Sequence, residues 1–309
     1  MQPQDTRAYP LPISRALEAA SGEGNSHSQV MLLADTITCY IGAVAVGQYS
    51  QALFTEEIES DPTLTRSLRS LRRVTPGQWL LWSAKGLGAA PQGRVEGMAT
   101  WYYGRADGPT AEAYGKVLQV MVEKLGYTGE YGPRADVSPR LLLEIVNQYS
   151  IIRSKRLEGR AGFEDDTDDA EVASVLLTGL QSGLSAGSFL KKYDLYAPQQ
   201  KQLLMGSEPT RPMPPISSPT DTNATLLLYP PGEVPDYTKR PNLQSERSPL
   251  FPLDPLLVYE RCGACDLHRV AALREVFGGT ALYRGLDPEC RHDLRVGEPV
   301  GAAAGDAQQ

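Results

Sequence analysis

The sequence predicts a mainly α protein, in which a helical bundle is followed by a linker and a small β-rich, zinc-ribbon-like unit. Three observations lead to this fold class. Apolar residues recur at three- and four-residue spacing through the first two-thirds of the chain, residues 206–248 are rich in Pro, Ser and Thr, and paired cysteines follow a short apolar run near the end. The first pattern is typical of amphipathic helices, and the last is typical of small metal-binding hairpins.

These patterns divide the chain into four parts. We expect a helical bundle over residues 1–204, a Pro/Ser-rich linker or extended arm over 205–249, a zinc-ribbon-like β unit over 250–297 and a disordered tail over 298–309. A chain of 309 residues with 41% hydrophobic residues can bury a sizeable core and divide into two units.

Composition limits the classes of partner. The net charge of −7 does not favour nucleic acid as a partner of the whole protein. Four cysteines, three of them clustered, do not form the pattern of a secreted disulfide framework, and Met1–Asp5 lacks the basic start of a signal peptide. We therefore expect a cytoplasmic protein with a protein partner and no membrane association.

The first long helix is expected over residues 28–54. Its central part, residues 30–46, is near the lower length limit for a membrane span and contains Asp35. The apolar residues that define one helical face are Leu33, Ile37, Tyr40, Ile41, Val44 and Ala45. This spacing favours a buried core helix with polar residues on its outer face over a membrane span.

Further helices are indicated by their ends and their apolar spacing. Residues 64–73 carry leucines on one side, Thr75-Pro76 caps and begins the next helix, and Ser138-Pro139 begins another that continues to Ile152. The helix over 111–125 has five residues that we expect to be buried: Tyr114, Val117, Leu118, Val120 and Met121.

An acidic run at residues 164–169 precedes the last predicted helix, which ends near Leu190. Carboxylates could bind a divalent cation, but this run lacks the alternating ligands and central glycine of a calcium loop. We interpret it as a helix start, where acidic side chains oppose the helix dipole.

A basic cluster precedes the acidic run. Its members are Arg153, Lys155, Arg156 and Arg160. The cluster could bind a phosphate or an acidic partner, and the alternative is a solvated helix end that compensates the dipole.

The order of segments resembles HEPN-like helical modules of bacterial multidomain signalling and conflict proteins, which accompany kinase or nucleotide-switch domains. The matching segments are residues 10–17, 35–49, 77–80 and 147–159. HEPN ribonucleases resemble one another in an Arg followed, five positions later, by a catalytic His. Here Arg153 is followed at that position by Glu158, and none of the histidines completes the motif.

Without that imidazole, RNA cleavage loses its usual proton carrier. The resemblance therefore implies a noncatalytic sensor or adaptor in bacterial signalling or anti-phage defence. A divergent HEPN-type ribonuclease is the alternative.

Other enzyme signatures are missing from the sequence, which has no phosphate loop and no dinucleotide fingerprint. Gly183–Gly187 matches the Gly-x-Ser-x-Gly pattern of hydrolases around Ser185. The preceding residues have helical rather than strand character, so we interpret the match as chance.

The strongest chemical signal lies in the β-rich unit. Strands are expected over residues 256–260, 270–277 and 280–284, and a short one over 225–229 in the linker. Cys262 and Cys265 follow the first of these, and the remaining candidate ligands are Cys290 and His292, with His268 as the alternative fourth ligand.

Three thiolates and one imidazole indicate a structural zinc. A degenerate ribbon with unmetallated thiols is the alternative at these residues, and a zinc-dependent nucleic-acid-binding module is a third functional hypothesis. A redox Cys-x-x-Cys is less favoured, because that type begins a helix.

Overall fold

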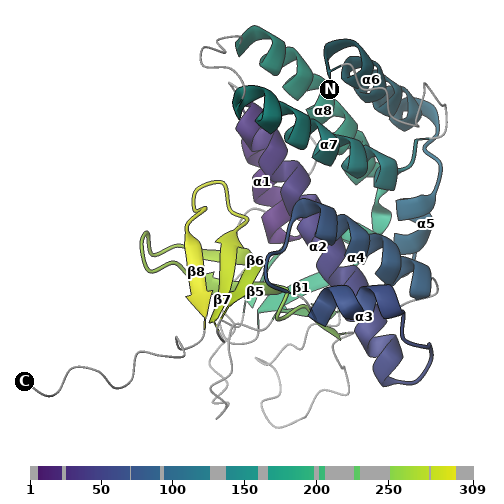
Figure 1. The fold of residues 1–309 in the computed structure, drawn as a ribbon, viewed down its shortest axis with the longest axis vertical. Coiled ribbons are helices and arrows are strands. Elements are labelled where there is room, and N and C mark those ends of the chain that lie inside the picture. Colours follow the sequence, from purple (N-terminus) through teal and green to yellow (C-terminus); the bar gives the residue numbers. More distant parts are fainter. Residues whose placement is uncertain are drawn as a thin grey trace, which may run out of the picture.

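A computed structural model describes residues 6–22, 26–69, 71–90, 94–125, 137–158, 166–197, 202–205, 226–229, 251–277 and 280–296. Within these ranges, helices come first and strands follow, as predicted (Figure 1). The helices are η1 (Thr6–Ala8), α1 (Leu11–Ser21), α2 (His27–Phe54), α3 (Pro62–Arg69), α4 (Pro76–Ala89), α5 (Met98–Tyr103), α6 (Gly108–Leu125), α7 (Pro139–Glu158), α8 (Asp166–Ala186) and η2 (Ser188–Lys191). The strands lie together on one side of the helical body, next to α1 and α2 (Figure 1).

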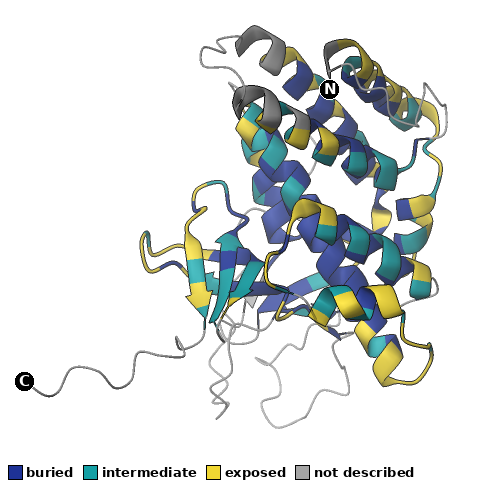
Figure 2. Cartoon of the chain, in the orientation of Figure 1, coloured by how far each residue is buried: buried dark blue, intermediate teal, exposed yellow. Residues whose placement is uncertain are grey.

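Helix α2 is the centre of the structure. Every residue from Thr36 to Tyr49 is buried, and between Val30 and Tyr49 only Met31 and Asp35 are partly exposed (Figure 2). The predicted polar outer face was therefore wrong, because small residues outside the predicted apolar face, such as Gly42, Ala43 and Gly47, let neighbouring elements cover the helix on all sides. Of the described helices only α2 is long and apolar enough to cross a membrane, and 83% of its most apolar window is buried inside the protein.

Helix α4 packs most extensively on α2. Its start is fixed as predicted: the Gln78 N–H donates to Thr75 Oγ1, and the Thr75 N–H donates to Gln78 Oε1. Along the contact, a Cβ added to Gly86 would lie 2.7 Å from the carbonyl oxygen of Ala45. Glycine is therefore required where the two helix backbones approach each other.

Among the described helices, α1 and α5 were not predicted, and several of the others differ from the predictions at their ends. The predicted helix over 64–73 ends at Arg69, and the one expected to reach Leu190 ends at Ala186 and is followed by η2. Of the residues expected to be buried on α6, only Val120 is partly exposed. Gly126, which was expected to end α6, lies outside the described residues.

A four-stranded antiparallel sheet was not predicted. It has the order β2-β1-β3-β4 and consists of β1 (Asp194–Ala197), β2 (Gln202–Leu203), β3 (Leu227–Tyr229) and β4 (Phe251–Pro252). Only β3 was expected. The strands come from three of the predicted parts, so the bundle, the linker and the β unit share one sheet. Apart from Met205, Leu226 and β3, the residues of the predicted linker and the whole predicted tail lie outside the described ranges.

This sheet covers one end of α2. Phe251 is buried, and a Cβ added to Gly47 would lie 2.5 Å from Cδ2 of Phe251. The segments on both sides of the predicted linker thus contact the helical body. Before the linker, the Leu204 carbonyl accepts the N–H of Leu11, and after it Phe251 packs against Gly47.

The second sheet is an antiparallel meander with the order β5-β6-β7-β8. Its strands are β5 (Leu257–Arg261), β6 (His268–Phe277), β7 (Thr280–Gly285) and β8 (Asp293–Val296). The predicted hairpin pairs Phe277 with Thr280, while Gly278 and Gly279 lie outside the described residues.

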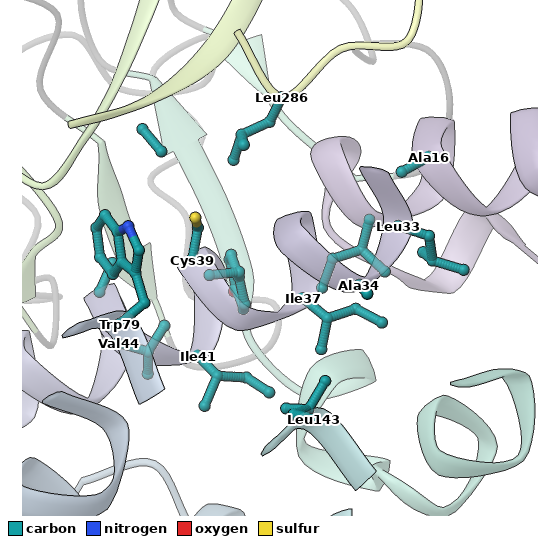
Figure 3. Packing of buried hydrophobic residues seen from close by; sticks show 14 of the residues in the cluster. Ala16, Leu33, Ala34, Ile37, Cys39, Ile41, Val44, Trp79, Leu143 and Leu286 are labelled. Atoms are coloured by element: carbon teal, nitrogen blue, oxygen red, sulfur yellow. The ribbon is translucent and has the colours of Figure 1, made fainter. Parts of the chain in front are cut away.

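The second sheet is attached to the helical body. The Val74 N–H donates to the Arg274 carbonyl at 2.6 Å, and the Val276 N–H donates to the Leu71 carbonyl at 2.9 Å. One continuous hydrophobic core includes residues of the helices and of this sheet, and Figure 3 shows Leu286 near Cys39 of α2 and Trp79 of α4. The helical and β-rich parts therefore bury a common apolar surface.

Asp35 is the single ionisable carboxylate of α2 and faces the second sheet. Burial raises the pKa of its carboxyl group from 3.8 to about 6, although the charges of Arg291 and Arg284 lower it. The folded protein therefore holds a proton on Asp35 over a range in which the unfolded chain has released it.

We predict that Gly86→Ala lowers the free energy of unfolding by about 1–3 kcal/mol, because the added methyl group meets the backbone of α2. Gly115→Ala is the matched control: Gly115 is exposed on α6, a Cβ there meets nothing within 4 Å, and this change should stabilise by about 0.5–1 kcal/mol. Denaturant unfolding measures both. Equal effects of the two changes would contradict the close packing of α2 and α4.

Asp35 is expected to make stability decrease as pH rises from about 4 to about 6, since its folded-state pKa is raised. Asp35→Asn should remove that slope and raise the free energy of unfolding at pH 7 by about 2–3 kcal/mol. Glu112→Gln, an exposed change on α6, serves as the control in the same pH series of denaturant melts. The same pH slope in Asp35→Asn and in the parent would contradict this prediction.

Candidate metal centre

The first two candidate ligands lie in a tight turn between β5 and β6. The Asp266 N–H donates to the Cys262 carbonyl, and the Cys262 N–H donates to the Leu267 carbonyl, both at 2.8 Å. Asp266 adopts a positive φ of 67°, which reverses the chain within a few residues. The Ala264 N–H lies 3.4 Å from Cys262 Sγ, so the turn directs a backbone donor toward this sulfur.

The other two ligands come from the connection between β7 and β8. The Cys290 N–H donates to the Asp287 carbonyl at 3.2 Å, and Cys290 is followed by Arg291 and His292 before β8 begins. A Cβ added to Gly285 would lie 2.1 Å from the Cys290 carbonyl oxygen, so the loop returns across a glycine at the end of β7.

The four donor atoms of Cys262, Cys265, Cys290 and His292 all lie within 4.8 Å of one another. His292 Nδ1 is 3.5 Å from the sulfurs of Cys262 and Cys290, and the sulfurs of Cys265 and Cys290 are 3.1 Å apart. Tetrahedral zinc with ordinary bond lengths places its donor atoms roughly 3.5–3.8 Å apart. The four cysteines of the chain are free thiols, so this group could hold a metal ion.

His268 lies outside this group. Its exposed side chain starts β6 and packs against Tyr259, with ring centroids 5.7 Å apart. Of the two histidines considered as the fourth ligand, the structure brings His292 to the cysteines.

Arg269 is a buried cation at the site, with 1% of its surface exposed. Nη1 donates to Cys290 Sγ at 2.7 Å, and Nη2 donates to the His292 carbonyl at 2.7 Å. Three thiolates with one divalent cation carry a net charge of −1, which a guanidinium in contact with a sulfur compensates. Arg269 was not predicted to belong to the site. A single arginine next to the apolar residues 270–273 did indicate a buried charge that needs a partner.

The surroundings of Cys262 and Cys290 shift the pKa values of their thiols in opposite directions. Desolvation raises the pKa of Cys262, but hydrogen bonds from the N–H groups of Ala264 and Cys265 and from Arg269 outweigh it and lower that pKa to about 5. Desolvation and the hydrogen bond with Cys265 raise the pKa of Cys290 to about 12. The Cys262 thiol therefore loses its proton more readily than the Cys290 thiol, and metal binding would displace the protons of the ligand thiols.

An ion pair ties the second ligand loop to the helical body. Arg15 of α1 pairs with Asp287, whose side chain is 4% exposed. Asp287 Oδ1 also accepts the N–H of Glu289 at 3.0 Å. The loop that supplies Cys290 and His292 is thus anchored to α1.

The other residues singled out from the sequence stay apart from this centre. Arg153 is partly buried on α7, whereas the side chains of Lys155 and Arg156, and Arg160 altogether, lie outside the described residues. Ser185 lies within α8, which is continuous from Asp166 to Ala186. The Gly-x-Ser-x-Gly match is thus preceded by a helix and not by the strand that a hydrolase requires, as predicted. Of the acidic run, residues 166–169 begin α8 as predicted, while 164–165 and all the side chains of the run lie outside the described residues.

No protein-family model, curated protein or solved structure matches this chain. The assignment of the centre therefore depends on its own geometry and chemistry.

We predict that the purified protein binds one metal ion per chain and that Cys290→Ser removes it. His268→Asn is the matched control and should still bind one metal ion per chain, because His268 packs against Tyr259 and lies outside the ligand group. Elemental analysis of the protein after dialysis measures both. Loss of metal in His268→Asn with retention in His292→Asn would contradict the ligand set.

Arg269→Gln is expected to weaken metal binding roughly 10–100-fold, the usual effect of removing a partner of a ligand. Arg295→Gln, an exposed change on neighbouring β8, should leave affinity unchanged. Competition with a chromophoric chelator gives both affinities, and equal values would exclude a role for Arg269.

Proposed function

We propose that this protein is a noncatalytic adaptor or sensor whose metal centre is a structural zinc in a zinc-ribbon-like unit. The observation that carries the proposal is the closed ligand set, since three sulfurs and one imidazole nitrogen lie within 4.8 Å of one another. Four protein ligands leave no position for a water or substrate, which is typical of structural zinc.

The place of the metal supports a structural role. The ligand loops belong to a sheet that contacts α1 through Arg15 and Asp287 and the α3–α4 connection through two backbone hydrogen bonds. A metal at this position would fix the sheet that covers the helices.

The helical body supports the role of a binding scaffold. Its segments resemble HEPN-like modules of bacterial signalling and conflict proteins, and Glu158 replaces the histidine of the ribonuclease motif. We therefore propose that it binds a protein partner in bacterial signalling or anti-phage defence.

One observation favours a divergent ribonuclease as the second candidate. The partly buried ring of His27, at the start of α2, lies 5.2 Å from the ring of Tyr149. Tyr149 is four residues before Arg153 on α7, so an imidazole from another helix approaches the same face of α7.

An RNA cleavage assay separates these candidates. The purified full chain, Arg153→Ala and His27→Ala are incubated with single-stranded RNA and the products resolved on a gel. The adaptor proposal predicts the same background for all three proteins, since none carries out catalysis. Cleavage by the parent that is lost in both variants would establish the ribonuclease and overturn the adaptor.

The adaptor proposal also predicts a defined complex. Co-expression with the products of neighbouring reading frames should give a stoichiometric complex with a kinase or nucleotide-switch protein on size-exclusion chromatography. Absence of a complex with every neighbouring product would count against the proposed role.

A further inference from the structure

A cavity of about 210 Å³ lies between the helical body and the second sheet. Its walls come from α2, from the connection that leads into α4, from β6 and β7, and from the loop that carries the metal ligands. Its charged lining residues are Asp35, Arg73, Arg274, Arg284 and Arg291.

The charge of this cavity is opposite to that of the whole chain. Four arginines line it with one carboxylate, although the net charge of the protein is −7. Asp293 lies 3.9 Å from Arg274 and 3.2 Å from Arg284 and so pairs with both. Arg73 and Arg291 are exposed and form no salt bridge with any residue that the structure describes. Two exposed guanidinium groups of the cavity lining can therefore contact an anion, and the charge of Arg291 also acts on Asp35.

The inner part of the cavity is apolar. Cys39 of α2, Trp79 of α4 and Leu286 after β7 come close to one another there (Figure 3). A closed apolar cavity of about 150 Å³ accommodates benzene. At about 210 Å³, the whole cavity, its arginine-lined part included, has room for one small aromatic molecule.

We propose that this cavity binds a small organic phosphate with a flat apolar body. The ring lies against Trp79 and Leu286, and the phosphate lies at the mouth between Arg73 and Arg291, where guanidinium groups form charge-assisted hydrogen bonds with it. Asp35 accepts a hydrogen bond from a donor group on the ring when the ligand carries one.

Such a ligand would contact both parts of the structure at once. Arg73 precedes α4, whereas Arg291 lies between the metal ligands Cys290 and His292. Binding therefore stabilises the attachment of the second sheet, and a ligand that binds only the attached form raises the unfolding temperature. The inference is independent of the proposed adaptor role, since it concerns binding by the isolated protein.

Isothermal titration calorimetry of the metal-loaded full chain with phenyl phosphate and with inorganic phosphate tests the proposal. Phenyl phosphate should bind at least ten-fold more tightly than inorganic phosphate. Arg73→Gln should weaken phenyl phosphate binding roughly ten-fold or more, because a hydrogen bond to a charged group is lost. Arg295→Gln, which lies outside the cavity lining, should bind as the parent does.

Arg291→Gln is a second variant. Because Arg291 lies between the metal ligands Cys290 and His292, the metal content of this variant is measured before its affinity is compared with that of the parent. It should weaken binding as Arg73→Gln does while retaining the metal. No heat of binding for phenyl phosphate, equal affinities for the two phosphates, or equal affinities in Arg73→Gln and Arg295→Gln would each overturn the proposal. None of these outcomes bears on whether the protein binds a partner.

Discussion

A helix without a polar face must be covered on every side, and the rest of this structure depends on that constraint. All residues of α2 from Thr36 to Tyr49 are buried. Helices α4, α1 and α8 cover part of this surface, and the two sheets close the remainder, with Phe251 against Gly47 and Leu286 near Cys39. Apolar burial at about 25 cal/mol per Å² is the dominant force in this arrangement, so the helical and β-rich parts are one packing unit.

Apolar contacts are not the whole attachment of the second sheet, whose outer strand β8 exposes Asp293 and Arg295 and buries none of its four residues fully. Its attachment adds an ion pair to α1 and two backbone hydrogen bonds to the α3–α4 connection. The candidate metal centre joins the β5–β6 turn to the β7–β8 loop. It lies in the same loop as the ion pair, at the end of the sheet opposite to the two backbone hydrogen bonds. A bound metal would hold β5 and β6 to the loop before β8. Arg269 would compensate the excess negative charge of the thiolates from inside the sheet.

Much of this could be predicted from local sequence, and the failures have physical causes. The Thr75-Pro76 helix start, the hairpin of β6 and β7 and the candidate ligands depend on short-range signals, which a single sequence contains. The sheet of β1 to β4 was missed because its strands are two to four residues long and are stabilised by pairing between distant segments. The outer face of α2 was misjudged because spacing identifies one apolar face but does not show that small and polar residues such as Thr36, Ala43 and Gln48 are buried on the other. The role of Arg269 could not be predicted, because the sequence does not show that its guanidinium contacts the sulfur of Cys290.

On this account a metal bound by the three cysteines and His292 holds the second sheet on the helical body. Amide hydrogen exchange of the full chain, with its metal and after chelation, tests it most directly. Removal of the metal should speed exchange across β5 to β8 and at the N–H groups of Val74 and Val276, which bridge the two parts, while α6 and α8 keep their protection. Unchanged protection of β5 to β8 in the metal-free protein would contradict the claim.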